Sequence, residues 1–216
     1  MASPAVSERT SLGQRIGAIL IAVAAIQFVG AMAWVQTGYP GYSLTQNYIS
    51  DLGNTSSSPL HVIFNVSIVL LGLLAIVGIA LSWGAFPRGG SRPVGLLLLL
   101  LASVAAIVVG FFPENVNGTI HDTASDLVFV PGGIALVVLS FGMRRPTWWT
   151  PMRWPSLVLG AIMLASILYY APTQMTNSTA DPGLIERFIV VPLLIWAVAV
   201  SVLILRRPSW PRLVRA

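Results

Sequence analysis

Six long apolar runs constrain the fold of this 216-residue chain more than any other feature. They cover residues 16–35, 60–83, 94–112, 120–141, 157–170 and 184–205. A helix needs roughly 20 apolar residues to cross a bilayer, and no run alternates as a transmembrane strand does. Only 9% of the residues are charged, against about a quarter in a soluble domain. The sequence therefore predicts an all-α, polytopic membrane protein: six transmembrane helices in one bundle, forming a single domain over residues 1–216.

The arginines predict how this bundle is oriented. The chain has no lysine, and 11 of its 12 basic residues flank the runs on one side. These are Arg9, Arg15, Arg88, Arg92, Arg144, Arg145, Arg153, Arg206, Arg207, Arg212 and Arg215. Because basic loops stay in the cytoplasm, we expect both termini inside and a multi-pass location in the inner (cytoplasmic) membrane. The net charge of +5 is then an orientation signal, and no nucleic acid is expected as a partner.

The first apolar run has a second interpretation. Ala31-Met32-Ala33 resembles the A-x-A cleavage site of a secretory signal peptide, and cleavage there would leave five spans. The run is, however, as long as a full span, and Trp34 would directly follow the cut. We therefore expect the first span to be retained.

Polar residues predict where three helices begin on the outer side. The signals are Ser58-Pro59, Thr119 with Asp122, and Asp181-Pro182. The first and third have a capping side chain followed by a proline suited to the first helical position. The second has the spacing of a capping box.

Ionisable and polar side chains gather near these outer helix starts. His61 and His121 each fall in the first turn of a predicted helix. The other members are Asn47, Ser50, Asp51, Glu114, Asp122, Ser125, Asp126, Glu186 and Arg187. Ionisable groups at membrane depth are costly, so such a gathering indicates a functional site.

Two of these acids share one predicted helix face. Asp122 and Asp126 are four residues apart and repel each other. Arg187 is the one basic residue expected on the outer side. We therefore expect an ion pair across the bundle between Arg187 and Asp51, Asp122 or Asp126. Removal of Arg187 should then destabilise the fold.

The same residue types suit hydrolysis of a lipid-like substrate. His121 or Asp126 would be the general base, and Asp51 would orient it. Ser50 is the candidate nucleophile. A headgroup would be bound by Asn47, Asp122, Glu186 and Arg187, with the arginine as a clamp for phosphate or carboxylate.

The two histidines also raise the question of a metal. Imidazole and carboxylate are zinc ligands, so His61 and His121 with a nearby acid are the candidate zinc ligands. The sequence has no cysteine and no H-E-x-x-H pattern. Structural interpretations stay open beside the chemical ones. Each histidine could bond a loop carbonyl, Asp122 could be only a helix cap, and Arg187 could belong to a structural ion pair.

A seven-residue motif in the first outer loop resembles a family hallmark. Asn47-Tyr48-Ile49-Ser50-Asp51-Leu52-Gly53 is similar to the N-x-I-S-D-L-G motif of an uncharacterised family of six-helix bacterial and archaeal membrane proteins. Three further pieces are similar: Phe64-Asn65, Gly110-Phe111-Phe112-Pro113 followed by His121, and Gly183-Leu184-Ile185-Glu186-Arg187. The resemblance implies a bundle whose characteristic residues gather outside, namely Asn47, Ser50, Asp51, Gly53, His121 and Arg187. It implies no reaction.

These observations favour a protein that handles a lipid or other amphiphile at the outer interface, by binding or by hydrolysis. The alternative is a non-catalytic scaffold, sensor or subunit of an envelope complex. A small transporter is disfavoured because the span centres carry almost no charge. The expected partners are membrane lipids and either a second copy or another membrane protein. Gly72 and Gly78 allow close helix packing, within or between chains.

Overall fold

The structure, a computed structural model, describes residues 10–144, 148–175 and 180–207. Its long helices are α1 (Leu12–Gly38), α2 (His61–Ser82), α3 (Ser91–Phe111), α4 (Gly118–Gly142), α5 (Arg153–Met175) and α6 (Pro182–Leu205). Short 3-10 turns follow as η1 (Ser50–Gly53), η2 (Trp83–Ala85) and η3 (Thr150–Met152). The described residues form no strand. All six long helices are long and apolar enough to span a membrane, which confirms the predicted all-α class.

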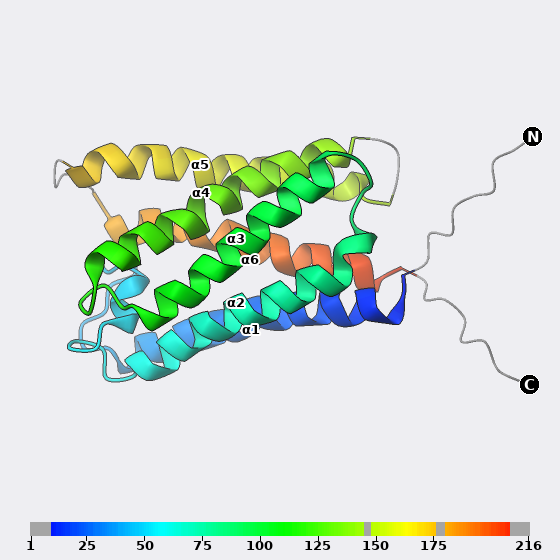
Figure 1. Cartoon of the computed structure of the whole chain (residues 1–216). Helices are drawn as coiled ribbons and strands as arrows, with labels where there is room; N and C mark the ends of the chain where they lie inside the picture. The colour runs from blue at the N-terminus through cyan, green and yellow to red at the C-terminus, as the bar shows by residue number, and fades with distance from the viewer. Residues whose placement is uncertain (1–9, 145–147, 176–179, 208–216) are drawn as a thin grey trace, which may run out of the picture.

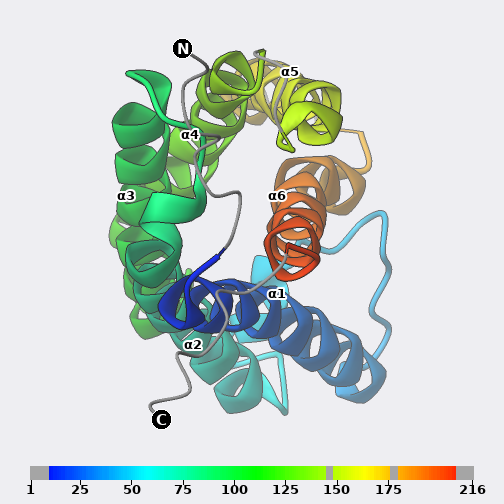
Figure 2. The same cartoon turned by 90° about the vertical axis from the view of Figure 1, so that its right-hand side faces the viewer.

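The helices form a closed ring, seen end-on in Figure 2. Each helix packs against the next along the chain, and α6 returns to pack against α1. Glycines bring neighbouring backbones together within the chain. A Cβ atom on Gly78 would lie 2.8 Å from the carbonyl oxygen of Gly17, and one on Gly72 would collide with the backbone of Ser103. The close packing expected of Gly72 and Gly78 is therefore intramolecular.

Both ends of the described chain lie at one end of the ring (Figure 1). Arg15 joins them, because its Nη1 donates to the carbonyl oxygens of Leu205 at 3.0 Å and Arg207 at 2.9 Å. The described arginines other than Arg187 gather here, and we call this the arginine end. Arg9, Arg145, Arg212 and Arg215 lie outside the described residues. The cytoplasmic placement of this end stays a prediction.

Stacked aromatic rings fill the core at the arginine end. Phe86 stacks on Trp149 with ring centroids 5.0 Å apart and on Trp196 at 6.4 Å. The indole N–H of Trp149 donates to the carbonyl oxygen of Ala85 at 2.8 Å, and that of Trp196 to the hydroxyl of Ser156 at 2.8 Å. Buried indoles usually find such partners. This aromatic layer closes the ring interior at the arginine end.

Most helices extend beyond the predicted spans. The largest difference is α5, predicted over 157–170 and observed over Arg153–Met175. Pro155 lies inside the first turn of this helix, where a proline removes no intrahelical bond. Helix α1 begins earlier than predicted because Ser11 and Gln14 form a reciprocal capping box. It runs without a break through Ala31-Met32-Ala33.

The predicted outer caps are wrong at α2 and α4, and at α6 the predicted position is right but the side chain makes no capping bond. Helix α2 begins at His61, and the buried hydroxyl of Ser58 caps nothing. Thr119 already lies inside α4, so Asn117 caps that helix by accepting from the N–H of Ile120 at 3.1 Å. At α6 the cap position is indeed Asp181, but its left-handed backbone turns the carboxylate away from the helix. That carboxylate accepts from the side chain of Gln46 at 2.7 Å.

Candidate functional site

The site lies at the end of the ring opposite the arginines, under the segment that joins α1 to α2. We call this segment, residues 39–60, loop one, and the end it covers the loop end (Figure 1). Loop one docks on the start of α6, where the N–H groups of Gly183 and Leu184 donate to the carbonyl oxygen of Thr45 at 2.9 and 3.3 Å. A Cβ atom at position 183 would collide with the carbonyl of Asn47. Glycine is therefore required at Gly183 for the two backbones to meet.

Arg187 fastens loop one to α6. Its Nη1 donates to the carbonyl oxygens of Asn47 at 3.2 Å and Gly183 at 2.7 Å, and its Nη2 donates to the hydroxyl of Tyr42 at 2.8 Å. The Tyr42 hydroxyl in turn donates to the carbonyl of Tyr48 at 2.9 Å. Burial raises the pKa of Tyr42, while the hydrogen bond from Arg187 lowers it. The phenol therefore stays protonated and can donate.

The predicted ion pair of Arg187 is wrong. Its partners are backbone carbonyls and a phenol, and within the described residues no aspartate lies at ion-pair distance from it. The guanidinium also lies 5.7 Å from the centroid of the Tyr42 ring, a cation–π contact. A fork of donors fits carbonyls converging from a loop and a helix. Three of the five N–H donors of Arg187 are used in these bonds, and the headgroup clamp expected of this residue stays a prediction.

Glu186, the neighbour of Arg187, holds the same loop by accepting. Its carboxylate accepts from the backbone N–H of Ile49, and the N–H of Ser50 is directed at it as well. These groups begin the η1 turn, where N–H groups have no partner within the turn. Glu186 and Arg187 thus bind opposite polarities of the loop-one backbone. This accounts for their joint presence at the start of α6.

Asp51 and Asn47 organise loop one from within. The carboxylate of Asp51 accepts from the side-chain amide of Asn47 at 3.0 Å and from the N–H of Tyr48 at 2.9 Å. The Asn47 side-chain oxygen accepts from the N–H of Ser43 at 3.0 Å. These bonds close the turn that presents Ile49 and Ser50 to Glu186. Asp51 therefore does not orient a histidine here, and its side chain serves the loop.

Asn65 on α2 joins the hallmark to α3. Its amide donates to the carbonyl of Gly53 at 3.0 Å, and a Cβ atom at Gly53 would collide with the Asn65 side chain. A Cβ atom at Gly110 on α3 would lie 2.8 Å from the Asn65 carbonyl. The four sequence pieces that carry the family resemblance therefore meet at the loop end. They meet because each supplies a close backbone approach or a hydrogen bond to the next.

The two histidines make the same local bond, but of the two His121 alone lines a cavity. His61 Nδ1 bonds the carbonyl of Ser58 at 2.8 Å, and His121 Nδ1 bonds the carbonyl of Phe112 at 2.9 Å. Because a carbonyl only accepts, each Nδ1 carries the proton, and each neutral ring keeps Nε2 as an acceptor. His121 is buried and lines a cavity, whereas His61 does not. This bears out the structural interpretation of a loop-carbonyl bond for both.

That cavity lies directly beneath loop one. It measures about 70 Å³ and has a polar upper boundary formed by Ser50, His121, Ser125 and Glu186. Its remaining walls are apolar, with Phe28 and Phe64 among them. Ser125 lies one turn after His121 on α4, so both face the same space. Side chains from loop one, α4 and α6 therefore meet at one point.

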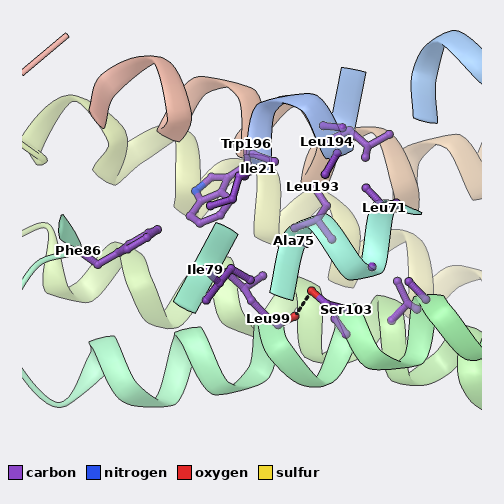
Figure 3. A pocket seen from close by; sticks show the side chains of 17 residues that line it. Ile21, Leu71, Ala75, Ile79, Phe86, Leu99, Ser103, Leu193, Leu194 and Trp196 are labelled. Atoms are coloured by element: carbon purple, nitrogen blue, oxygen red, sulfur yellow. Dashed lines mark hydrogen bonds between the residues drawn. The ribbon is translucent and has the colours of Figure 1, made fainter. Parts of the chain in front are cut away.

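A second cavity of about 90 Å³ continues toward the arginine end. It shares Leu71, Ala106 and Val128 with the first, so the two adjoin inside the ring. Figure 3 shows its walls, which reach Phe86 and Trp196 in the aromatic layer. Its one side-chain hydroxyl, on Ser103, is satisfied by the carbonyl of Leu99 at 2.7 Å. The interior therefore has one polar end and one apolar end.

Several predicted residues lie away from these cavities. Asp122 and Asp126 are exposed and line neither, so Asp126 is not placed as a base nor Asp122 as a ligand there. In the described part of the chain, no three His, Asp or Glu side chains are placed to hold a metal. Zinc bound through His61 and His121 thus finds no support in the geometry.

Tyr42 was missed because an aromatic loop residue gives no signal of its partner.

The fold and composition define a class, namely a six-helix protein whose helices can all cross a membrane. Within that class, the chain belongs to the family described as "Protein of unknown function (DUF998)", which matches residues 17–203. Comparison with curated proteins and with solved structures finds no match. The family match supports the six-span resemblance. The hallmark itself and a bacterial or archaeal origin stay predictions.

Proposed function

We propose that this protein binds a membrane amphiphile, with a hydrocarbon chain inside the helix ring and a polar group under loop one. One observation carries the proposal: two adjoining cavities that have polar side chains at one end alone. The polar end holds Ser50, His121, Ser125 and Glu186. A molecule with a polar head and an apolar tail has this same distribution of groups.

The cavity volumes fit a short hydrocarbon segment. An apolar cavity of about 150 Å³ stays dry and binds a small hydrocarbon such as benzene. The two cavities, of about 70 and about 90 Å³, together have about that size. A dry void deprives its lining of dispersion contacts, so filling it with hydrocarbon is favourable. Part of an alkyl or isoprenoid chain is therefore the natural occupant.

Variants in the shared wall of the two cavities test this proposal. Ala106 lines both cavities and is buried, whereas Val104 on the same helix is 51% exposed on the outer surface of the ring. We expect Ala106→Phe, or the milder Ala106→Leu, to lose lipid that copurifies with the wild type. Val104→Phe should keep it. Mass spectrometry of the protein in nanodiscs measures this, and equal lipid in all variants would contradict the proposal.

Hydrolysis of the bound amphiphile is the second candidate. The observation that favours it is His121, whose Nε2 is an acceptor in the cavity wall when the ring is neutral. Such a nitrogen is suited to a general base, and Ser50 or Ser125 would be its neighbour in the cavity. An ester of a medium-chain acid is the test substrate. Cleavage that is lost in His121→Gln and kept in His61→Gln would support an enzyme, and none in the wild type would leave binding alone.

A further inference from the structure

The polar end of the cavity presents two groups that accept, on His121 and Glu186, beside the hydroxyls of Ser50 and Ser125, which donate or accept. His121 Nε2 has no hydrogen-bond partner among the described residues, since the one bond of this ring is made by Nδ1. The Glu186 carboxylate accepts from the backbone at Ile49 and Ser50. A carboxylate offers about four acceptor positions, so capacity remains. Two acceptors facing one space favour a ligand group that donates hydrogen bonds.

The charge balance at this point argues against an anionic ligand. Arg187 is the one described arginine at the loop end, and its guanidinium is turned to Asn47, Gly183 and Tyr42. It does not line either cavity. A phosphate or carboxylate in the cavity would therefore face Glu186 without a cation of its own. Taking such a charge out of water without a partner is costly.

An ammonium group is disfavoured for the opposite reason. The charge of Glu186 is already offset in part by Arg187, its neighbour in the chain, and by two backbone N–H groups. The local charges therefore sum to nearly zero, and an uncharged donor fits them best.

We infer that the ligand is an uncharged lipid alcohol, whose hydroxyl donates to His121 or Glu186 while its chain fills the cavities. This inference rests on the proposed function, because it assigns the chemical class of the same ligand. Long-chain alcohols, acylglycerols and isoprenoid alcohols share this chemistry. Ser50 and Ser125 can donate to the oxygen of that hydroxyl, since a serine both donates and accepts.

A panel of ten-carbon compounds tests the headgroup while the chain stays constant. The compounds are decanol, decanoate, decyl phosphate and decylamine, each added to protein in phosphatidylcholine nanodiscs. A bound ligand raises the unfolding temperature in proportion to its occupancy, so thermal shifts rank the four. We expect decanol to bind at least tenfold more tightly than either anion and more tightly than the amine.

Two histidine variants locate the contact. Loss of one hydrogen bond in His121→Phe should weaken decanol binding by roughly tenfold or less. His61→Phe is the matched control, because His61 makes the same Nδ1 bond outside the cavity, and it should leave binding unchanged. Ser125→Ala serves if His121→Phe does not fold, and should weaken decanol binding by a smaller factor.

The outcomes separate the two proposals. If decanoate, decyl phosphate or decylamine binds as tightly as decanol, the alcohol inference is overturned while amphiphile binding stands. Equal effects of His121→Phe and His61→Phe would also overturn it. If none of the four compounds binds, the proposed function itself fails.

Discussion

The two ends of the helix ring are closed by different means. At the loop end, charged side chains on α6 bind the backbone of loop one, with Arg187 donating to the carbonyl of Asn47 and Glu186 accepting from the N–H of Ile49. At the arginine end, Phe86, Trp149 and Trp196 stack in a buried layer. The first closure depends on directional bonds at a few points. The second depends on filled volume.

This difference explains where the cavities lie. Aromatic rings pack densely and leave little space, so the interior ends at Phe86 and Trp196. A loop held by hydrogen bonds at its backbone spans the opposite end without filling it. The space beneath keeps polar groups at its boundary, including Ser50 and His121. A ring that is closed by packed aromatic rings at one end and by a hydrogen-bonded loop at the other suits the proposed ligand, whose polar group would face loop one.

The largest expected effect concerns which end faces the cytoplasm. The chain has no cysteine, so single cysteines can be placed at will. A membrane-impermeant maleimide applied to intact cells should label Thr55→Cys in loop one and should not label Arg88→Cys at the arginine end, both of which are exposed sites. Labelling of Arg88→Cys alone would show that the bundle has the opposite orientation. Permeabilised cells, in which both sites react, are the control.

Truncation in the aromatic layer should cost the most stability. Trp149 is 2% exposed, and Trp149→Ala should lower the free energy of unfolding by about 3–5 kcal/mol. Trp154 is 60% exposed, so Trp154→Ala should change it by about 0.5 kcal/mol or less. Circular dichroism during thermal unfolding in detergent measures both. Similar losses of stability in the two variants would mean that the aromatic layer is not a packed core.

Removal of Arg187 should open the loop end. Arg187→Ala deletes three hydrogen bonds from a charged group and leaves the carbonyl of Asn47 without its donor, which should cost about 3 kcal/mol. Hydrogen exchange should rise in loop one more than in the aromatic layer. Arg88→Ala, at an exposed position of the other end, is the control. An unchanged unfolding temperature for Arg187→Ala would contradict the role of this residue.

The sequence predicted the helices well because membrane spanning is a one-dimensional constraint. Length and apolar content suffice to recognise a span, and all six were predicted. The gathering of Ser50, His121 and Arg187 at one end was predictable for the same reason, since helix starts alternate between the two ends. What the sequence lacked was the partner of each side chain.

Partner choice depends on which backbone groups a loop leaves free. Arg187 was expected to pair with an aspartate, yet it donates to the loop-one carbonyl of Asn47, while Asp122 and Asp126 are exposed and can be solvated by water. Trp149 and Trp154 pose the same difficulty. They lie five positions apart with similar neighbours, and one is buried while the other is not. The cavities also follow from packing, which no residue pattern in this chain encodes.

The smallest expected effect is a pH dependence at Tyr42, which sharpens the contrast between bonded and packed ends. Burial raises the pKa of Tyr42 above its ordinary value of 10.0, so the folded state holds this proton more tightly than the unfolded state. The stability that the protonated Tyr42 phenol contributes is therefore complete below about pH 10 and is lost as the pH rises through the folded-state pKa. Tyr42→Phe should cost about 1 kcal/mol at pH 8 and progressively less above pH 10. Tyr39→Phe is the control, because the described residues give the Tyr39 hydroxyl no hydrogen bond. If the difference in the free energy of unfolding between wild type and Tyr42→Phe stays constant from pH 8 to 11, the phenol is not a donor to Tyr48.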